Sequence, residues 1–174
     1  MLKKVLFGFL FVLIVINTTI SPAAAAADGN ELAAVALFID TSGHYVPGVD
    51  LLNKALNEVI RFKVNFLLLG SEVQSGNEVL RDLKNCNINN AADATLEGLA
   101  QYGQDRHVNY IVLVSVRPLD VALDLKAYSA TDNAYILDKS VTRPDGTETA
   151  SVLDTLSSMV GDEVAQVLQT IHRS

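Results

Sequence analysis

One unbroken apolar segment, residues 32–39, constrains this chain more than any other part of its sequence. The segment has the length of a strand, and it ends abruptly in Asp40, Thr41, Ser42 and Gly43. A run that is apolar at every position is typical of a strand buried on both faces, as in parallel sheets. Loops that follow such strands lie at the carboxyl edge of the sheet, where open α/β folds hold ligands. The segment therefore predicts a central strand with a candidate site directly behind it.

The first 26 residues have the pattern of a secretory signal peptide. Lys3 and Lys4 precede a charge-free apolar segment, residues 5–16, and an alanine-rich tract follows at residues 23–27. The apolar segment is shorter than a transmembrane helix, which needs about 20 residues. We therefore expect cleavage after Ala26, leaving a single domain, residues 27–174, that is exported and periplasmic or extracellular, in association with the envelope. The alternative is an uncleaved amino-terminal anchor.

Charge and composition exclude several classes of partner and cofactor. Loss of Lys3 and Lys4 with the leader changes the net charge from −7 to −9. An acidic domain is a poor partner for nucleic acid or anionic lipid, and we expect no membrane span after cleavage. Cys86 is the only cysteine, so no intramolecular disulfide can form. No zinc-type Cys/His spacing, phosphate loop or dinucleotide fingerprint is present, so the sequence predicts no cofactor.

Hydrophobic periodicity predicts nine elements in the order β-α-β-α-α-β-β-β-α. Strands are expected at residues 32–39, 62–69, 108–116, 121–128 and 134–143, and helices at 47–61, 75–84, 93–101 and 151–172. The second of these helices, residues 75–84, begins with Ser75 and Glu78 at capping-box spacing. The first three strands should be parallel through right-handed crossovers, and the last two should form an antiparallel hairpin. The predicted fold class is α/β, with a mixed sheet in two or three layers.

This order of elements resembles a group of bacterial envelope domains. The resemblance lies in residues 34–39 before a polar loop, in Leu99 and Ala100 ahead of residues 108–114, and in residues 123–128 with the polar turn and strand behind them. It is a resemblance to the amino-terminal domain of TolB, the curli secretion protein CsgG and the activator lipoproteins of penicillin-binding proteins. It implies a non-enzymatic, partner-binding module of the cell envelope, with an envelope protein or a glycan as partner. The cysteine that anchors the lipoprotein members is missing near the cleavage region.

Residues 38–44 are also similar to the start of von Willebrand factor A domains, where D-x-S-x-S after the first strand holds magnesium through hard oxygen ligands. Asp40 and Ser42 match this motif, but His44 replaces its second serine and is a poorer ligand for a hard cation. The antiparallel hairpin also suits that mainly parallel fold badly. A degenerate adhesion domain with a loop at Asp40 is therefore the second hypothesis.

A hydrolase built on Ser42 and His44 is the third hypothesis. The G-x-S-x-G signature is absent, and residues this close in one loop rarely reach the geometry of a nucleophile and its base. Asp40 and Ser42 are expected instead to cap the next helix or to make hydrogen bonds of an Asx turn. We therefore assign no catalytic and no metal-binding residue from the sequence.

The loops after the first three strands should share one edge of the sheet and could form a polar crevice there. A solvated rim is the alternative, because the same residues would also be at home in water. The candidate binding residues are Asp40, Ser42, His44, Glu72, Arg117 and Asp120.

Overall fold

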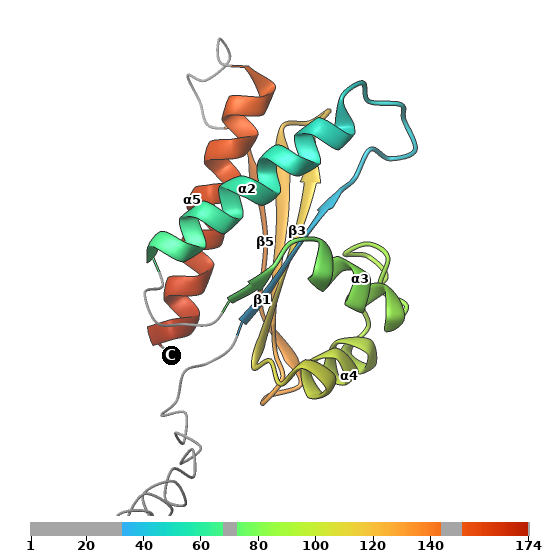
Figure 1. The fold of residues 1–174 in the computed structure, drawn as a ribbon, viewed down its shortest axis with the longest axis vertical. Helices are drawn as coiled ribbons and strands as arrows, with labels where there is room; N and C mark the ends of the chain where they lie inside the picture. Colours follow the sequence, from blue (N-terminus) through green and yellow to red (C-terminus); the bar gives the residue numbers. More distant parts are fainter. Residues whose placement is uncertain (1–32, 68–72, 144–150, 174) are drawn as a thin grey trace, which may run out of the picture. The chain divides into compact units, whose positions relative to one another are not determined.

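A five-stranded mixed sheet with helices on both faces makes up the part of the chain described by the structure, a computed structural model covering residues 33–67, 73–143 and 151–173 (Figure 1). The order of elements and the fold class predicted from the sequence are confirmed. In chain order the elements are β1 (Ala33–Ile39), α2 (Val49–Leu67), β2 (Val73–Ser75), α3 (Asn77–Asn85), α4 (Leu96–Arg106), β3 (Tyr110–Arg117), β4 (Ala122–Ser129), β5 (Ala134–Thr142) and α5 (Val152–Arg173).

The apolar segment at the start of the domain is the second strand of a sheet ordered β2-β1-β3-β4-β5. β1 pairs in parallel with β2 on one side and with β3 on the other, so that Ala33 aligns with both Val73 and Tyr110. All of β1 except Ile39 is buried, which explains why its sequence is apolar at every position. β4 pairs antiparallel with β3 on one side and with β5 on the other, and the β4–β5 pair is the predicted hairpin.

Alternate residues of each strand face two separate hydrophobic cores, because side chains point to opposite faces of a sheet. Helices α2 and α5 lie on one face and α3 and α4 on the other, which makes three layers (Figure 1). The first core joins the sheet to α2 and α5 through Val35, Leu37, Val114, Leu125, Leu56, Leu156 and Val160. The second joins it to α3 and α4 through Ala36, Phe38, Leu113, Tyr128, Val79, Leu83 and Leu99.

Side-chain caps fix where two of the helices begin. The Thr95 hydroxyl accepts the Gly98 N–H at 3.1 Å at the start of α4, and the Ser151 hydroxyl accepts the Asp154 N–H at 3.1 Å at the start of α5. Each cap satisfies one of the amide groups that a helix leaves unpaired at its first turn. α4 ends at Arg106, and His107, the residue that caps it, is in the left-handed conformation. This helix therefore begins and ends later than the predicted 93–101. None of the helices in the described ranges is both long and apolar enough to cross a membrane.

Two local predictions are wrong. Residues 62–67, expected in the second strand, continue helix α2, and the strand at this place in the chain is the short β2, Val73–Ser75. No Gly or Pro separates Val49 from Leu67, so helical hydrogen bonding propagates through the alternating segment once the helix has begun. The capping box at Ser75 does not form either: Ser75 belongs to β2, and Gly76 precedes α3 without a side-chain cap.

Candidate binding crevice at the carboxyl edge of the sheet

The loop after β1 is held by the carboxylate of Asp40. Asp40 Oδ1 accepts the backbone N–H of Ser42 at 2.7 Å and lies 3.5 Å from its hydroxyl, as in an Asx turn. Ser42 has a positive φ of 50° and Gly43 one of 78°, so the chain reverses sharply here. The N–H of Asp40 donates to the Val116 carbonyl at 2.8 Å, which fastens the loop to the end of β3. One oxygen of the carboxylate is therefore used to shape the loop itself.

His44 closes the same turn. Its N–H donates to the Thr41 carbonyl at 2.9 Å, and its ring Nδ1 lies 3.2 Å from that same oxygen. The ring therefore contacts the backbone rather than the Ser42 hydroxyl, which lies against the Asp40 carboxylate. This arrangement does not make His44 a base for Ser42. Among the described residues, no three His, Cys, Asp or Glu side chains are grouped so that they could hold a metal ion.

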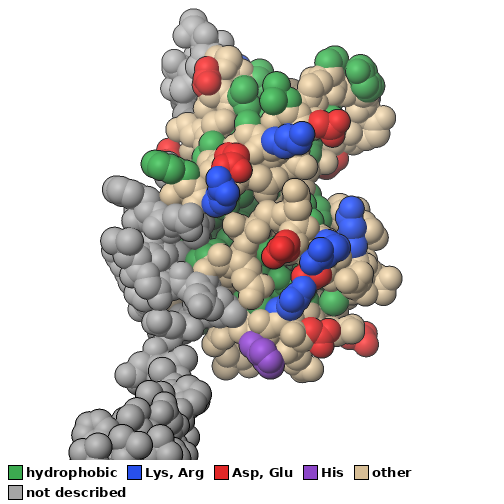
Figure 2. Space-filling view, viewed as in Figure 1, with side chains coloured by type: hydrophobic (Ala, Val, Ile, Leu, Met, Phe, Trp, Pro, Cys, Tyr) green, Lys and Arg blue, Asp and Glu red, His purple; other side chains and the backbone are tan. Residues whose placement is uncertain are grey.

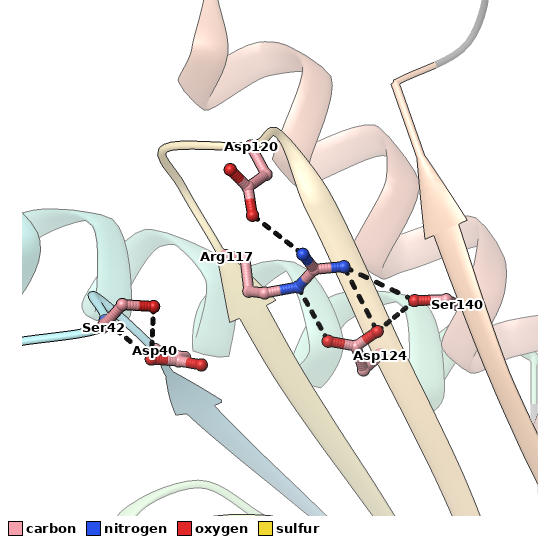
Figure 3. A network of polar contacts seen from close by, with 6 residues as sticks. All are labelled: Asp40, Ser42, Arg117, Asp120, Asp124 and Ser140. Carbon is pink, nitrogen blue, oxygen red and sulfur yellow. Dashed lines mark hydrogen bonds and ion pairs between the residues drawn. The ribbon is translucent and has the colours of Figure 1, made fainter.

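Arg117 organises the second cluster of polar side chains, at the ends of β3, β4 and β5 (Figure 3). Its Nε and one amino group donate to the two oxygens of Asp124 at 2.8 and 3.4 Å, and its other amino group donates to Asp120 at 2.8 Å. Ser140 also lies 3.5 Å from the guanidinium and hydrogen-bonds Asp124. The hydrogen bond to Asp124 is the main cause that raises the pKa of Arg117, and the Asp124 and Asp120 charges add to it. A bidentate guanidinium and carboxylate hold each other in one orientation.

These side chains belong to an uncovered part of the sheet. Val114, Val116, Leu123 and Leu125 face α2 and α5, so the residues between them point to the opposite face. Helices α3 and α4 cover that face where Tyr128 is buried, whereas the polar residues nearer the β3–β4 turn, Ser115, Arg117, Asp124 and Lys126, are only half-buried. We call this uncovered set the open face: Ser115, Arg117, Asp124, Lys126, Asp138 and Ser140.

A hollow of about 400 Å³ lies beside the open face. Phe38, Ser115, Asp124 and Ser140 align in one row across β1, β3, β4 and β5, so the row leads from the hollow to the outer strand. The hollow is lined by residues 38–43, at the end of β1 and in the loop that follows it, by residues 90–92 between α3 and α4, and by Ser115. A volume of this size is within the range of ligand pockets, although those are usually more apolar.

A second hollow, of about 480 Å³, lies beside β2, the outer strand on the side of the sheet away from β5. Three of its charged side chains are ion-paired: Arg106 with Asp82, and Arg61 with Glu58, which lies outside the lining. Figure 2 shows basic and acidic side chains intermingled over α3, so this side presents no surface of one charge. We therefore place the candidate site at the carboxyl edge, where polar loops and the open face meet.

Five of the six predicted site residues fall into two clusters, and the sixth cannot be placed. Asp40 and Ser42 line the hollow, and His44 lies in the same loop. Arg117 and Asp120 belong to the neighbouring ion-pair network, and among the residues drawn in Figure 3 no hydrogen bond or ion pair joins that network to Asp40 or Ser42. Glu72 lies outside the described residues.

Four polar residues of this region were not identified from the sequence: Asn90, Ser115, Asp124 and Ser140. Ser115 carried a usable signal, because it is the single polar side chain within the apolar segment 111–116, two positions before Arg117. Period-two alternation then places it on the same face as Arg117. Asn90 had no such signal, since only the fold brings its loop to the end of β1.

No protein-family model and no curated protein sequence matches the chain. Comparison with solved structures finds TolB from Acinetobacter baumannii, with 15% identity and a TM-score of 0.46 over 79% of this chain. This chain spans 28% of that TolB chain. The PelC dodecamer from Paraburkholderia phytofirmans shows 10% identity and a TM-score of 0.45, with 81% of this chain and 89% of that chain covered.

The C-terminal domain of LpoB from Escherichia coli shows 10% identity and a TM-score of 0.37, with 64% of this chain and 80% of that chain covered. The predicted resemblance to the TolB group of bacterial envelope domains is thereby confirmed as a similarity of fold. At these identities and scores the similarity carries no information about activity.

Proposed function

We propose that this chain is an exported module of the bacterial cell envelope that binds a protein or glycan partner and has no catalytic activity of its own. The observation that carries the proposal is the open face with its adjoining hollow: a polar, partly exposed part of a sheet that α3 and α4 leave uncovered. Uncovered sheet surface with a concavity beside it is where partners and ligands commonly bind.

The contacts around Asp40 favour binding over catalysis. Its carboxylate shapes the Asx turn, and His44 contacts the Thr41 carbonyl, so both groups are engaged with the backbone of their own loop. A nucleophile would instead need a base within hydrogen-bonding reach. The ion pairs of Arg117 with Asp120 and Asp124 fix polar groups in place, which suits recognition of a polar partner.

Export is the second part of the proposal. The lysines at positions 3 and 4, the short apolar segment and the alanine tract together support cleavage after Ala26. The mass of the intact protein recovered from the envelope fraction tests it, and we expect a chain that begins at Ala27. A product that keeps residues 1–26 and partitions with membranes would show an uncleaved anchor instead.

Filling the hollow tests the binding site. Ser115 lines the hollow and is half-buried, so Ser115→Phe should occupy the space that a partner would use. Ser158→Phe, at an exposed position of α5, adds the same side chain elsewhere. With a photoreactive side chain at position 92, on the rim of the hollow, we expect Ser115→Phe to lower the crosslinking yield about tenfold, equivalent to about 1.4 kcal/mol.

The Ser158→Phe control should crosslink like the parent protein. Equal yields from the two variants, with both folded, would show that the hollow is not the binding site. Turnover of a generic ester or peptide substrate that disappears in Ser42→Ala would favour the hydrolase hypothesis and contradict a purely binding function.

A further inference from the structure

β5 is an outer strand of the sheet and, within the described residues, the longer of its two edges. It spans nine residues, Ala134–Thr142, and pairs with β4 on one side. In the described parts of the chain, the sheet order ends at β5, and no strand lies beyond it. The outer side of such a strand presents backbone N–H and C=O groups to which a further strand can hydrogen-bond. Ile136 near its beginning is 47% exposed.

The two faces of β5 differ in chemistry. Asp138, Ser140 and Thr142 are exposed on the side of the open face. Leu137 and Val141 point to the other side and are partly buried against the core of α2 and α5. A strand that adds to β5 would continue both faces, because side chains alternate along it with the same period. Its alternate residues would therefore meet polar side chains on one face, and on the other Leu137, Val141 and, between them, Lys139, which is hydrogen-bonded to α5.

Charge specifies the polar positions of such a strand. On and beside the open face the described carboxylates are Asp120, Asp124 and Asp138, against the two cations Arg117 and Lys126. Asp138 is the carboxylate nearest the edge; its side chain is 63% exposed, and it lies 3.6 Å from Lys126. Directly opposed unlike charges stabilise cross-strand pairs, and like charges destabilise them. A basic side chain opposite Asp138 is therefore favoured.

A second copy of this chain fits the edge badly. An antiparallel pair of β5 strands related by a twofold axis places the central residue opposite itself. Centring on Asp138 opposes two carboxylates, and centring on Lys139 opposes two ammonium groups. Lys139 is also already hydrogen-bonded to Glu163 and Gln166 of α5. Pairs centred on Leu137 or Ser140 oppose no like charges, but the β5 residues on the side of Asp138 include no cation, so no register of a second copy places a basic side chain opposite it. The charge of Asp138 thus favours a different chain.

We propose that β5 accepts an extended segment of a protein partner in which basic and apolar residues alternate, the basic ones facing Asp138 and the apolar ones covering Leu137 and Val141. This inference rests on the proposed partner-binding function and makes the partner a protein rather than a glycan. The row from Phe38 through Ser115 and Asp124 to Ser140 joins the hollow to this edge, so one partner can contact both.

Two synthetic peptides test the proposal on the exported chain: nine residues alternating lysine and valine, and the same peptide with glutamate for lysine. Amide hydrogen exchange measured by NMR should show new protection within residues 134–142 on addition of the lysine peptide. We expect the lysine peptide to bind at least tenfold more tightly than the glutamate peptide, and Asp138→Lys to reverse this preference. Asp105→Lys, which makes the same change of charge at an exposed position of α4, should leave the preference intact.

Each other result has a distinct meaning. If Asp138→Lys and Asp105→Lys lose the preference for the lysine peptide equally, net charge alone attracts the peptide, and this would overturn the proposal. Binding that protects no amide of β5, or no binding by either peptide, would also overturn it, while the crosslinking result at the hollow would still decide the proposed function separately. Protection of β5 that rises with protein concentration without any peptide would identify a second copy as the occupant and equally overturn it.

Discussion

The two ends of one sheet face, built from the same strands, behave as opposite surfaces. At the end covered by α3 and α4, Tyr128 is fully buried, its ring meets Tyr135 edge-on with centroids 6.2 Å apart, and the Tyr135 hydroxyl donates to the Ala94 carbonyl at 3.0 Å. At the open face, two and four residues back along β4, Lys126 and Asp124 are half-buried and ion-paired.

The difference shows how a sheet can keep part of a face for contact without losing stability. The opposite face of β4 is dry throughout, with Leu123, Leu125 and Ala127 fully buried against α2 and α5. Because burial of apolar surface is the dominant favourable contribution to folding, that face and the core under α3 and α4 can stabilise the domain without the open face. The polar side chains of the open face need only hold one another in position, and partly exposed ion pairs do this at little gain or cost.

Replacing Leu125 with alanine gives the largest expected effect. Leu125 has no exposed surface in the core of α2 and α5, so the variant should lose about 2–5 kcal/mol of unfolding free energy. Its neighbour Lys126 points to the open face, and Lys126→Ala should lose less than about 1 kcal/mol. Urea denaturation of the two variants measures this contrast. Comparable losses would mean that the open face contributes to stability as the dry face does.

The covered end should give the protein a sensitivity to alkali. Burial raises the pKa of Tyr102 to about 12, with a smaller contribution from Cys86. In the unfolded chain the tyrosine has a pKa of about 10. The free energy of unfolding is therefore unaffected below pH 10, and it falls by about 2–3 kcal/mol as the pH rises towards 12, because only the unfolded chain ionises in that range. Tyr102→Phe should reduce this loss, and should cost little at pH 7, because the buried hydroxyl has no hydrogen-bond partner in the described residues. Urea midpoints between pH 8 and 11.5 measure both; an unchanged slope in Tyr102→Phe would contradict the assignment.

The ion-pair network of the open face should couple two substitutions. Arg117→Met and Asp124→Asn each remove the bidentate contact at 2.8 and 3.4 Å, so the double variant should be less destabilised than the sum of the single variants by about 1 kcal/mol. A double-mutant cycle in urea at low and high salt measures the coupling, which should shrink with salt because the side chains are partly exposed. Strict additivity would show that the contact makes no difference to stability.

The Asp40 loop should give the smallest effect, and it separates the binding module from the adhesion domain. Asp40→Ala removes the acceptor of the Ser42 N–H and should cost about 1 kcal/mol, with or without metal. Millimolar magnesium should leave the melting temperature of the parent protein unchanged beyond a small effect of ionic strength. A metal-specific rise of several degrees, about 2–8 °C, that disappears in Asp40→Ala would instead support an adhesion-type metal site.

The sequence predicted the strands and the long helix better than it predicted the site. The apolar runs of β1 and β3 and the stripe of α5 are long and regular, so their periods identify them. The segment 62–67 alternates over too few residues to decide between a strand and the continuation of a helix, and it lies before any breaking residue. β2 has only three residues and is a strand because it pairs with Ala33–Val35 of β1. The local sequence of β2 gives no sign of that pairing.

For the site, order along the chain was enough to bring Asp40 and Arg117 to one edge, because parallel strands end together. It was not enough to show what each side chain contacts. Asp124 lies within a strand and looked like an ordinary outward residue of a hairpin, yet it is the main partner of Arg117. That pairing depends on the register between β3 and β4, which places Arg117 opposite Ala122 and Ser115 opposite Asp124, so the sequence alone does not contain it in readable form.

The unequal lengths of the two outer strands limit how such a domain can assemble. β5 offers nine residues at one side of the sheet, whereas β2 offers three at the other. Growth of a fibre by edge-to-edge pairing needs two extended edges on every subunit, one to receive and one to offer. With one long edge, pairing through β5 is complete after a single addition. A domain of this kind can capture one strand from another protein while its own sheet remains protected from polymerising.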